Sequence, residues 1–431
     1  MTLKDKSTPV LVLNAIHYGA LGITRSLGRL GVTVYNQSPF RSVPAFQSKY
    51  SRSNIVWDQD AAGPDSTVHF LLSIGKSFER PALLIPTCDV TAMLVADYDE
   101  TLRTCFQFPR QRKQLVHSLC SKKGLYNIAT RCGIPTPETT FPESRSDVLR
   151  FIESAVFPIV VKTVKNLIGT QTARAVKVIV RDRQRVLPLW DQLQEPGEPN
   201  LMLQEYIPGD DDSNWMFNGY FNENSECLFG LTGRKIRQFP AYAGVTSLGV
   251  CTANETVRTT TLSFMRALQY RGIIDMGYRF DARDGKYKVY DINPRVGATF
   301  RLFVDTLGYD VVRAFYLDMT HQGVSPCQIR EGRRWMVEDA DLLSSFRYRS
   351  DRQLSVRSWI RSLRGIEEGA LFAVDDMMPL GARMTDHCRK LFGMRRGTPT
   401  LPNETCAAPQ EITLQPESPQ EYARHADGDT F

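Results

Sequence analysis

The segment Asp291-Ile-Asn293-Pro-Arg295 follows an apolar run and carries residue types suited to phosphate chemistry. Side chains alternate along a strand, so Asp291, Asn293 and Arg295 are expected to share one face. Carboxylate and amide oxygens are good ligands for Mg²⁺, and a guanidinium binds phosphate oxygens through paired hydrogen bonds. The segment therefore predicts a magnesium–phosphate site. An ordinary strand end followed by an Asn-Pro turn explains these five residues equally well.

Two lysines and a second apolar segment add to this pattern. Lys122 begins a predicted helix that runs toward Gly133-Ile-Pro, and Lys162 directly follows the apolar run 157–161, a predicted buried strand. A lysine ammonium is a compact charge that binds phosphates, although a single surface lysine is usually only solvated. The stretch 202–209, Met-Leu-Gln-Glu-Tyr-Ile-Pro-Gly, is the fourth segment. Together the four segments favour a nucleotide site.

In order and spacing, these segments resemble the ATP-grasp superfamily. The likeness consists of a lysine at a helix start, a strand that delivers a lysine, a Glu-Tyr-Ile segment and a carboxylate-x-Asn-Pro-Arg strand, and it spans about residues 115–320. Four ordered segments are far more specific than any one of them. The resemblance implies ATP and Mg²⁺ as cofactors and a two-subdomain ATP-grasp fold that holds ATP between two sheets.

The resemblance also implies a role for individual residues. It assigns the α and β phosphates of ATP to Lys122 and Lys162, the adenine edge to Glu205 and Ile207, the ribose hydroxyls to Asp212, Mg²⁺ to Asp291 and Asn293, and the γ-phosphate and acyl phosphate to Arg295. Catalysis by such a site consists of positioning and electrostatic stabilisation of the transferring phosphoryl group.

The sequence departs from the family pattern at the first metal carboxylate. The family places this residue about a dozen positions before Asp291, and that register falls on Tyr278 or Arg279, neither of which binds metals. Asp275 and Asp281 share a strand face with Arg279, and we favour Asp281 as the replacement.

The phosphate-binding loop is a second departure. After Lys162 the only candidate is 166–170, Asn-Leu-Ile-Gly-Thr, which contains a single glycine. A degenerate nucleotide-binding protein without ligase activity is therefore an open alternative.

The segment Gly233-Arg-Lys-Ile-Arg237 could bind a substrate carboxylate or the triphosphate, and a solvated basic strand is an equal alternative. Arg234 and Arg237 point to the same side only if this segment is helical; on a strand one of them must be structural or solvated, with Arg234 the weaker candidate. Together with 295–301, Arg-Val-Gly-Ala-Thr-Phe-Arg, it is similar to bacterial ATP-grasp carboxylate–amine ligases of the D-aspartate ligase type.

The elements that must position these residues predict an α/β and α+β fold. A strand at 10–13, a helix at 19–30 and a strand at 32–35 indicate a parallel α/β opening. His17, in the first loop, is interpreted as structural. We predict a small pre-ATP-grasp domain at 1–115, the ATP-grasp domain at 116–325, an Arg-rich helix-compatible extension at 326–396 anchored by Trp335 and Trp359, and a disordered tail at 397–431.

Bulk composition narrows the class of protein. The net charge of +6 is modest for 431 residues, and nine cysteines without a CxxC pair indicate reduced thiols rather than a disulfide framework. We expect a cytoplasmic enzyme with small-molecule carboxylate and amine substrates, and no nucleic-acid or membrane partner; a homodimer is left open. Thiol or hydroxyl nucleophiles also remain open, and the basic C-terminal stretch alone suggests RNA, without the interleaved aromatics that stacking requires.

Overall fold

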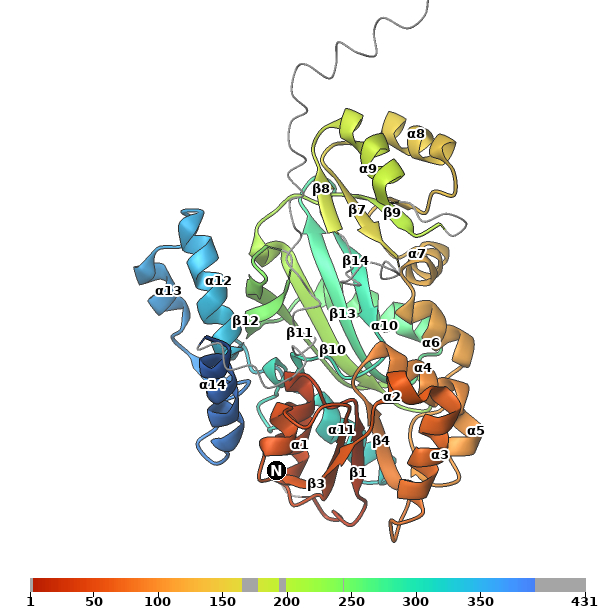
Figure 1. Cartoon of the computed structure of the whole chain (residues 1–431), viewed down its shortest axis with the longest axis vertical. Helices are drawn as coiled ribbons and strands as arrows, with labels where there is room; N and C mark the ends of the chain where they lie inside the picture. Colours follow the sequence, from red (N-terminus) through yellow and green to blue (C-terminus); the bar gives the residue numbers. More distant parts are fainter. Residues whose placement is uncertain (1–2, 165–176, 194–198, 243, 392–431) are drawn as a thin grey trace, which may run out of the picture. The chain divides into compact units, whose positions relative to one another are not determined.

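The computed structural model describes residues 3–164, 177–193, 199–242 and 244–391 (Figure 1). The chain divides into two compact units. The smaller unit is Pro142–Tyr206, and the larger contains the chain before and after it. The predicted glycine-containing loop at 166–170 and the predicted tail at 397–431 lie outside the described residues.

The N-terminal part of the larger unit is a parallel five-stranded sheet with the strand order β3-β2-β1-β4-β5. Its elements are β1 (Val10–Leu13), α1 (Tyr18–Gly28), β2 (Val34–Ser38), η1 (Pro44–Gln47), β3 (Ser51–Val56), α2 (Gln59–Ala62), α3 (Pro64–Gly75), β4 (Ala82–Pro86), α4 (Asp89–Asp97), α5 (Asp99–Leu102) and β5 (Phe106–Gln107). Alternate residues of β1 contribute to two different cores, one containing α1 and the other α3 and α4. The predicted parallel α/β opening is confirmed.

A seven-stranded sheet follows, with the order β14-β13-β10-β11-β12-β15-β16. Its elements are η3 (Asp211–Ser213), β10 (Asn214–Phe221), β11 (Cys227–Phe239), β12 (Val245–Cys251), α10 (Glu255–Ala267), β13 (Gly272–Asp281), β14 (Lys286–Asn293), η4 (Phe300–Leu302) and α11 (Val311–Met319). Strands β13 and β14 form a hairpin: they pair antiparallel, and Gly285 in their turn has φ +69°. This hairpin brings Asp291 and Asn293 to one end of the sheet.

The predicted helix that begins at Lys122 is α7 (Lys122–Arg131), and a separate helix, α6 (Lys113–Cys120), directly precedes it. Ser121 is extended, with φ −99° and ψ 130°, and its side chain caps α7 by accepting a hydrogen bond from the Gly124 amide. An ideal Cβ at Gly124 would lie 2.4 Å from the Ser118 carbonyl oxygen, so this sharp junction requires glycine. As a result, Lys122 stands at the first position of α7.

The C-terminal region is less purely helical than its composition predicted. Two short strands, β15 (Arg334–Met336) and β16 (Ile366–Gly369), extend the large sheet, alongside α12 (Glu338–Ser350), α13 (Val356–Ser362) and α14 (Met378–Leu391). Trp335 is buried in β15, and the half-buried Trp359 of α13 donates a hydrogen bond from Nε1 to Asp341. Both tryptophans therefore act as anchors, as expected.

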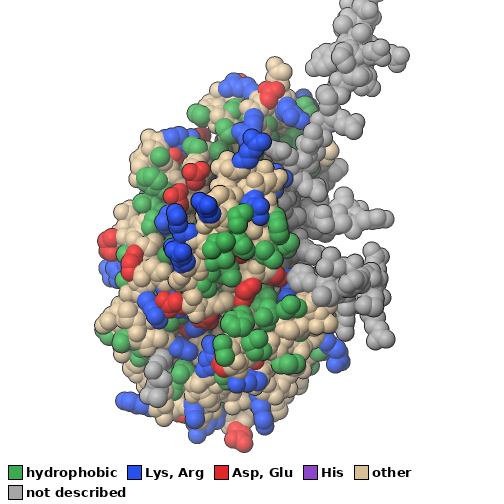
Figure 2. All heavy atoms as spheres, turned by 90° about the vertical axis from the view of Figure 1, so that its left-hand side faces the viewer, with side chains coloured by type: hydrophobic (Ala, Val, Ile, Leu, Met, Phe, Trp, Pro, Cys, Tyr) green, Lys and Arg blue, Asp and Glu red, His purple; other side chains and the backbone are tan. Residues whose placement is uncertain are grey.

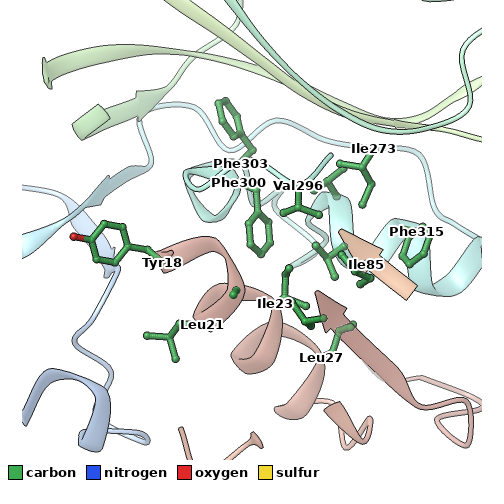
Figure 3. Packing of buried hydrophobic residues seen from close by; sticks show 14 of the residues in the cluster. Tyr18, Leu21, Ile23, Leu27, Ile85, Ile273, Val296, Phe300, Phe303 and Phe315 are labelled. Carbon is green, nitrogen blue, oxygen red and sulfur yellow. The ribbon is translucent and has the colours of Figure 1, made fainter. Parts of the chain in front are cut away.

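One hydrophobic core joins the N-terminal sheet to the chain that follows β14 (Figure 3). Val296 and Phe300 point toward Ile23 of α1 and Ile85 of β4, and Phe303 of the same cluster points away from them, toward the large sheet. Helix α11, which lies about 230 residues after β4 in the sequence, contributes Phe315 to the same cluster. The segment next to Arg295 is thus held by packing against the N-terminal sheet, and the predicted boundary near residue 115 is not a boundary in packing.

The smaller unit has its own sheet and core. Its elements are α8 (Arg145–Ser154), β7 (Ile159–Thr163), β8 (Lys177–Val180), η2 (Arg183–Arg185), α9 (Val186–Leu193) and β9 (Leu201–Glu205), after the short β6 (Thr139–Thr140). Strand β7 pairs antiparallel with both β8 and β9. The apolar run at 157–161 fills the core through Ile159 and Val161, and Lys162 follows at the partly exposed end.

Candidate functional site

The end of β14 carries a connected row of polar side chains. Asn293 Nδ2 donates to Asp291 Oδ2 at 3.0 Å, and Arg295 Nη2 donates to Asn293 Oδ1 at 2.9 Å. Arg295 Nε also donates to Asp89 Oδ1 at 2.7 Å, at the start of α4. These contacts confirm that Asp291, Asn293 and Arg295 share one face. We call these three residues, with Asp275 described next, the β14 cluster.

Asp275 of β13 lies directly opposite Asn293, whose Nδ2 is 3.4 Å from its Oδ2. Loss of hydration raises the pKa of Asp275 to about 6, with Arg295 opposing the shift. An ideal Cβ at Gly297 would come within 2.5 Å of the Asp275 carboxyl group, so only glycine allows the chain to cover it. Asp275 is therefore a partly buried acid, covered on one side by the chain at Gly297, beside the predicted metal ligands.

Asp281, which we favoured as the third metal ligand, lies elsewhere. It pairs in register with Lys286 at the far end of the hairpin, whereas Asp291 is opposite Gly277. Six residues of strand separate Asp281 from Asp275, roughly 20 Å. Its buried carboxylate already binds Arg283 and Lys288, at 2.6 and 2.7 Å, which holds its pKa well below the usual value. The geometry does not bring Asp281 into the cluster, and Asp275 is the β13 carboxylate that lies beside Asn293.

Lys122 is near the β14 cluster. Burial lowers the pKa of Lys122, and the charge of Asp291 opposes that shift. The cap at Ser121 fixes this lysine at the start of α7, so its ammonium is directed by a helix end rather than by a flexible loop. The structure thus brings together Lys122 and Asp291, two residues separated by most of the predicted domain.

The segment after Glu205 is held by an arginine that sequence reasoning passed over. Arg279 donates from Nε to the Ile207 carbonyl at 2.8 Å and from Nη2 to the Gly209 carbonyl at 2.6 Å. Its Nη1 donates to Asn214 Oδ1 at 3.1 Å. Arg279 stands in the register where the resemblance expects a metal carboxylate. Here that position fixes the backbone of the predicted adenine segment.

Arg234 and Asp212, two predicted site residues, form an exposed ion pair of 3.4 Å. The segment 233–237 belongs to β11 and is a strand, so the helical arrangement that would align Arg234 with Arg237 is wrong. A bulge in the pairing with β12 occurs between Lys235 and Arg237. Arg234 and Arg237 therefore do not form a joint binding site for one carboxylate.

Arg237 is the structural member of the pair. Its Nε and Nη2 each donate at 2.8 Å to the two oxygens of Asp341, and Nη1 donates to Ser362 at 2.7 Å. Both partners of the Arg237–Asp341 pair are almost completely buried. All three guanidinium nitrogens of Arg237 already donate hydrogen bonds to residues of α12 and α13. The prediction that Arg237 binds a substrate carboxylate is therefore not supported.

Two further residues complete the comparison with the sequence. Within the smaller unit, Lys162 donates from Nζ to Gln204 Oε1 at 2.7 Å, beside Glu205 at the end of β9. His17 accepts from the Gly19 amide at the start of α1, and its Nε2 contacts the Thr87 carbonyl. Burial lowers the pKa of His17 to about 4. His17 is a neutral capping residue, which confirms the structural interpretation.

The side chains of the β14 cluster are better suited to a Mg²⁺ ion that arrives with nucleotide phosphates than to a metal ion held permanently by the protein alone. No group of three or more His, Cys, Asp or Glu side chains in the described part of the chain could hold a metal. The cluster offers two carboxylates and an amide, which are hard oxygen donors. Asn218, buried beside Asp275, has an Oδ1 without a hydrogen-bond partner in the described structure. Magnesium commonly completes its shell with substrate phosphates and water, as this donor set requires.

Comparisons with known proteins give a consistent result. No family model matches the chain. The chain is similar to a D-aspartate ligase from Enterococcus faecium, with 25% identity over 240 residues, which cover 54% of this chain and 57% of that ligase. The chain therefore spans little more than half the length of this relative.

Solved structures show the same fold. The L-amino acid ligase from Bacillus licheniformis has a TM-score of 0.54 and 13% identity, covering 75% of this chain and 78% of that chain. The biotin carboxylase domain of 2-oxoglutarate carboxylase from Hydrogenobacter thermophilus, solved with MgADP, has a TM-score of 0.57 and 14% identity. That match covers 75% of this chain and 73% of the other.

Proposed function

Because the chain belongs to the ATP-grasp superfamily, we propose that it is an ATP-dependent ligase that activates a carboxylate as an acyl phosphate and couples it to an amine. The observation that carries this proposal is the row from Asp291 through Asn293 to Arg295, with Lys122 beside it. It places oxygen donors for a divalent cation next to two cations suited to phosphate. A relative named D-aspartate ligase and a fold shared with an L-amino acid ligase support the amine as nucleophile.

In this proposal Asp291 and Asn293 hold Mg²⁺, and Asp275 completes the set of protein oxygens. Bound MgATP supplies the phosphoryl group that activates the carboxylate. Arg295 neutralises charge that develops on the transferring phosphate, because it lies on the same face as the metal ligands. Asp89 orients Arg295 and leaves it partly exposed, so the guanidinium can reach a ligand.

Lys122 and Lys162 contact the nucleotide phosphates in the proposed complex. Glu205 and Ile207 present backbone groups to the adenine, with Arg279 keeping the chain at Ile207 and Gly209 in place. Asp212 binds the ribose hydroxyls and is held by Arg234. Of the two arginines in the 233–237 segment, Arg234 is the one that could bind a substrate carboxylate. Its ion pair with Asp212 is exposed, so a substrate carboxylate could take the place of Asp212.

A nucleotide-binding protein without ligase activity is the second candidate. It is favoured by one observation: the residue opposite Asp291 on β13 is Gly277, which offers no side-chain ligand. The two functions differ in their products. Ligation through an acyl phosphate releases ADP and phosphate, whereas a binding protein releases neither.

The decisive experiment is a matrix of carboxylates and amines assayed for ADP and phosphate. D-Aspartate is the first amino acid in the matrix, because of the name of the similar ligase. We expect ADP release that depends on one carboxylate and one amine together. MgATP protection against thermal unfolding without ADP release from any pair would instead support the binding protein.

A further inference from the structure

Exposed hydrophobic side chains are concentrated in one part of the chain. Ten of the seventeen large hydrophobic residues that are exposed in the described structure lie between Leu342 and Met384. Figure 2 looks onto the side of the molecule where α12, α13 and α14 lie, and hydrophobic side chains gather there beside Lys and Arg. Contiguous exposed apolar surface of this kind usually marks an interaction site.

Helix α12 is apolar on the face where a surface helix is normally polar. Its buried stripe, Ala340, Asp341, Ser344, Ser345 and Tyr348, is mostly polar and faces the body of the unit. Its outer face exposes Leu342, Leu343 and Phe346, the last by 57%. Burial against the body does not explain these three residues, because the buried stripe is on the other side of the helix.

Helix α13 has the same character. None of its residues is buried, and it exposes Val356 and Ile360, which are four positions apart and share one face. Trp359 binds Asp341 of α12 and Ser362 binds Arg237 of β11, so α13 is held beside α12. We define the α12–α13 surface as Leu342, Leu343, Phe346, Val356 and Ile360 with the arginines around them.

Those arginines give the surface a strong positive charge. Between Leu342 and Arg364 the chain contains six arginines and one acidic residue, Asp351, and all six arginines are exposed: Arg347, Arg349, Arg352, Arg357, Arg361 and Arg364. Only Arg347 is paired with Asp351 within this segment. Exposed leucine, phenylalanine and isoleucine among arginines is the composition of helices that lie in the interface of an anionic bilayer.

We propose that the α12–α13 surface docks on an anionic lipid bilayer. The apolar residues enter the boundary between headgroups and acyl chains, and the arginines bind lipid phosphates and carboxylates. The helices lie on the membrane and do not span it; none of the described helices is long and apolar enough to cross one. The sequence analysis expected no membrane partner, and this proposal departs from that expectation.

Vesicle cosedimentation tests the proposal with the full-length protein. We expect the protein to pellet with phosphatidylcholine vesicles that contain phosphatidylserine, and not with pure phosphatidylcholine. Phe346→Glu with Ile360→Glu removes the apolar anchor, and Arg357→Glu with Arg361→Glu reverses the charge. Each double variant should lower the vesicle partition coefficient about 10-fold or more.

Matched controls come from the smaller unit. Leu149→Glu with Val156→Glu introduces the same charge at exposed apolar positions, and Arg145→Glu with Arg150→Glu reverses the same number of exposed arginines. Both controls should bind vesicles like the original protein, and all four double variants should keep its melting temperature because the changed side chains are exposed.

Any one of several outcomes would overturn the proposal. They are equal binding to neutral and anionic vesicles, no binding to either, equal losses in the α12–α13 variants and their controls, and a dimer that Phe346→Glu with Ile360→Glu converts to a monomer without any vesicle binding. The last result would assign the surface to a second copy of the chain. Binding of single-stranded RNA in place of vesicles would likewise contradict it.

Discussion

Arg237 on β11 and Arg295, two residues beyond the end of β14, each have a carboxylate partner, but the two ion pairs differ in how far solvent reaches them. Arg295 contacts Asp89 at 2.7 Å, and Asp89 is 42% exposed. Arg237 forms two bonds to Asp341 in a pair that is 4% and 1% exposed. An arginine whose partner is exposed can exchange it for a phosphate oxygen at little cost. A fully buried pair cannot separate without leaving an uncompensated charge, which costs about 3–5 kcal/mol.

In our proposal, solvent access to the partner, and not the presence of an ion pair, distinguishes Arg295, the proposed phosphate ligand, from the structural Arg237. Changes at the β14 cluster should therefore affect the reaction and spare the fold. Changes at Arg237 should affect the fold and spare the chemistry of the molecules that remain folded.

The largest expected effect is on the rate, at the metal ligands. Asp291→Asn removes the negative charge of one proposed ligand, and Asn293→Ala removes the oxygen of the other. The double variant should lower ADP formation by about a thousand-fold or more, since neutralisation of phosphoryl charge by a metal contributes several kcal/mol. The measurement is steady-state ADP release at saturating ATP. Asp284→Asn, in the turn of the same hairpin, is the control and should keep its activity. Full activity in the double variant would place the metal elsewhere.

The next effect separates Arg237 from Arg295. Arg237→Ala leaves Asp341 buried without its main partner and should lower the free energy of unfolding by about 3–5 kcal/mol in urea denaturation. Arg295→Ala should leave stability within about 1 kcal/mol, because its main partner is partly exposed, and should lower kcat. If Arg295→Ala proved the more destabilising of the two, the distinction drawn here would be incorrect.

Strand alternation predicted that Asp291 and Asn293 would share a face, because the pairing of β14 with β13 is regular from Asp291 to Asn293. The same rule could not place the 233–237 segment, where a β-bulge interrupts the pairing. Strand alternation also could not predict that Arg237 would bind Asp341, which is 104 residues away in sequence. Partners distant in sequence decide which of two similar arginines is available, and a single sequence does not reveal them.

Asp275 should make stability depend on pH. Its folded pKa of about 6 exceeds the reference value of 3.8, so the folded state binds the proton more tightly. Stability from this group is present at low pH and falls as pH rises from about 4 to about 6, by roughly 2–3 kcal/mol. Asp275→Asn should abolish that fall, so urea denaturation should find it equal to the original protein near pH 4 and more stable near pH 7. A stability difference that does not change with pH would contradict the assignment.

The smallest effect is expected at Arg234. Its ion pair with Asp212 is exposed, so Arg234→Ala should change the free energy of unfolding by less than about 0.5 kcal/mol. It should raise the KM for the carboxylate or for ATP with little change in kcat, because a ground-state contact is lost. Initial rates at varied carboxylate and at varied ATP separate the two. A lower kcat with unchanged KM values would instead indicate that Arg234 stabilises the transition state.

Much of the fold was readable from local patterns, such as the apolar run of β1, the glycine turn of the β13–β14 hairpin and the capped start of α7 at Lys122. The sequence also placed Arg279 where the resemblance expects a metal carboxylate, and that expectation stays a prediction. The sequence could not choose the replacement: Asp275 and Asp281 share one face of β13, and only the pairing with Asn293 distinguishes them. Two short strands, β15 and β16, were missed because three or four residues give too few alternations to detect.

The most direct test of the proposed reaction follows an oxygen atom. With an ¹⁸O-labelled carboxylate, ATP and the amine, a carboxylate oxygen attacks the γ-phosphorus and the bond to ADP breaks. The amine then attacks the carbonyl carbon, and phosphate leaves with the labelled oxygen. Mass spectrometry of the released phosphate should find one ¹⁸O per molecule formed. ADP and amide formation with no label in the phosphate would contradict the acyl phosphate.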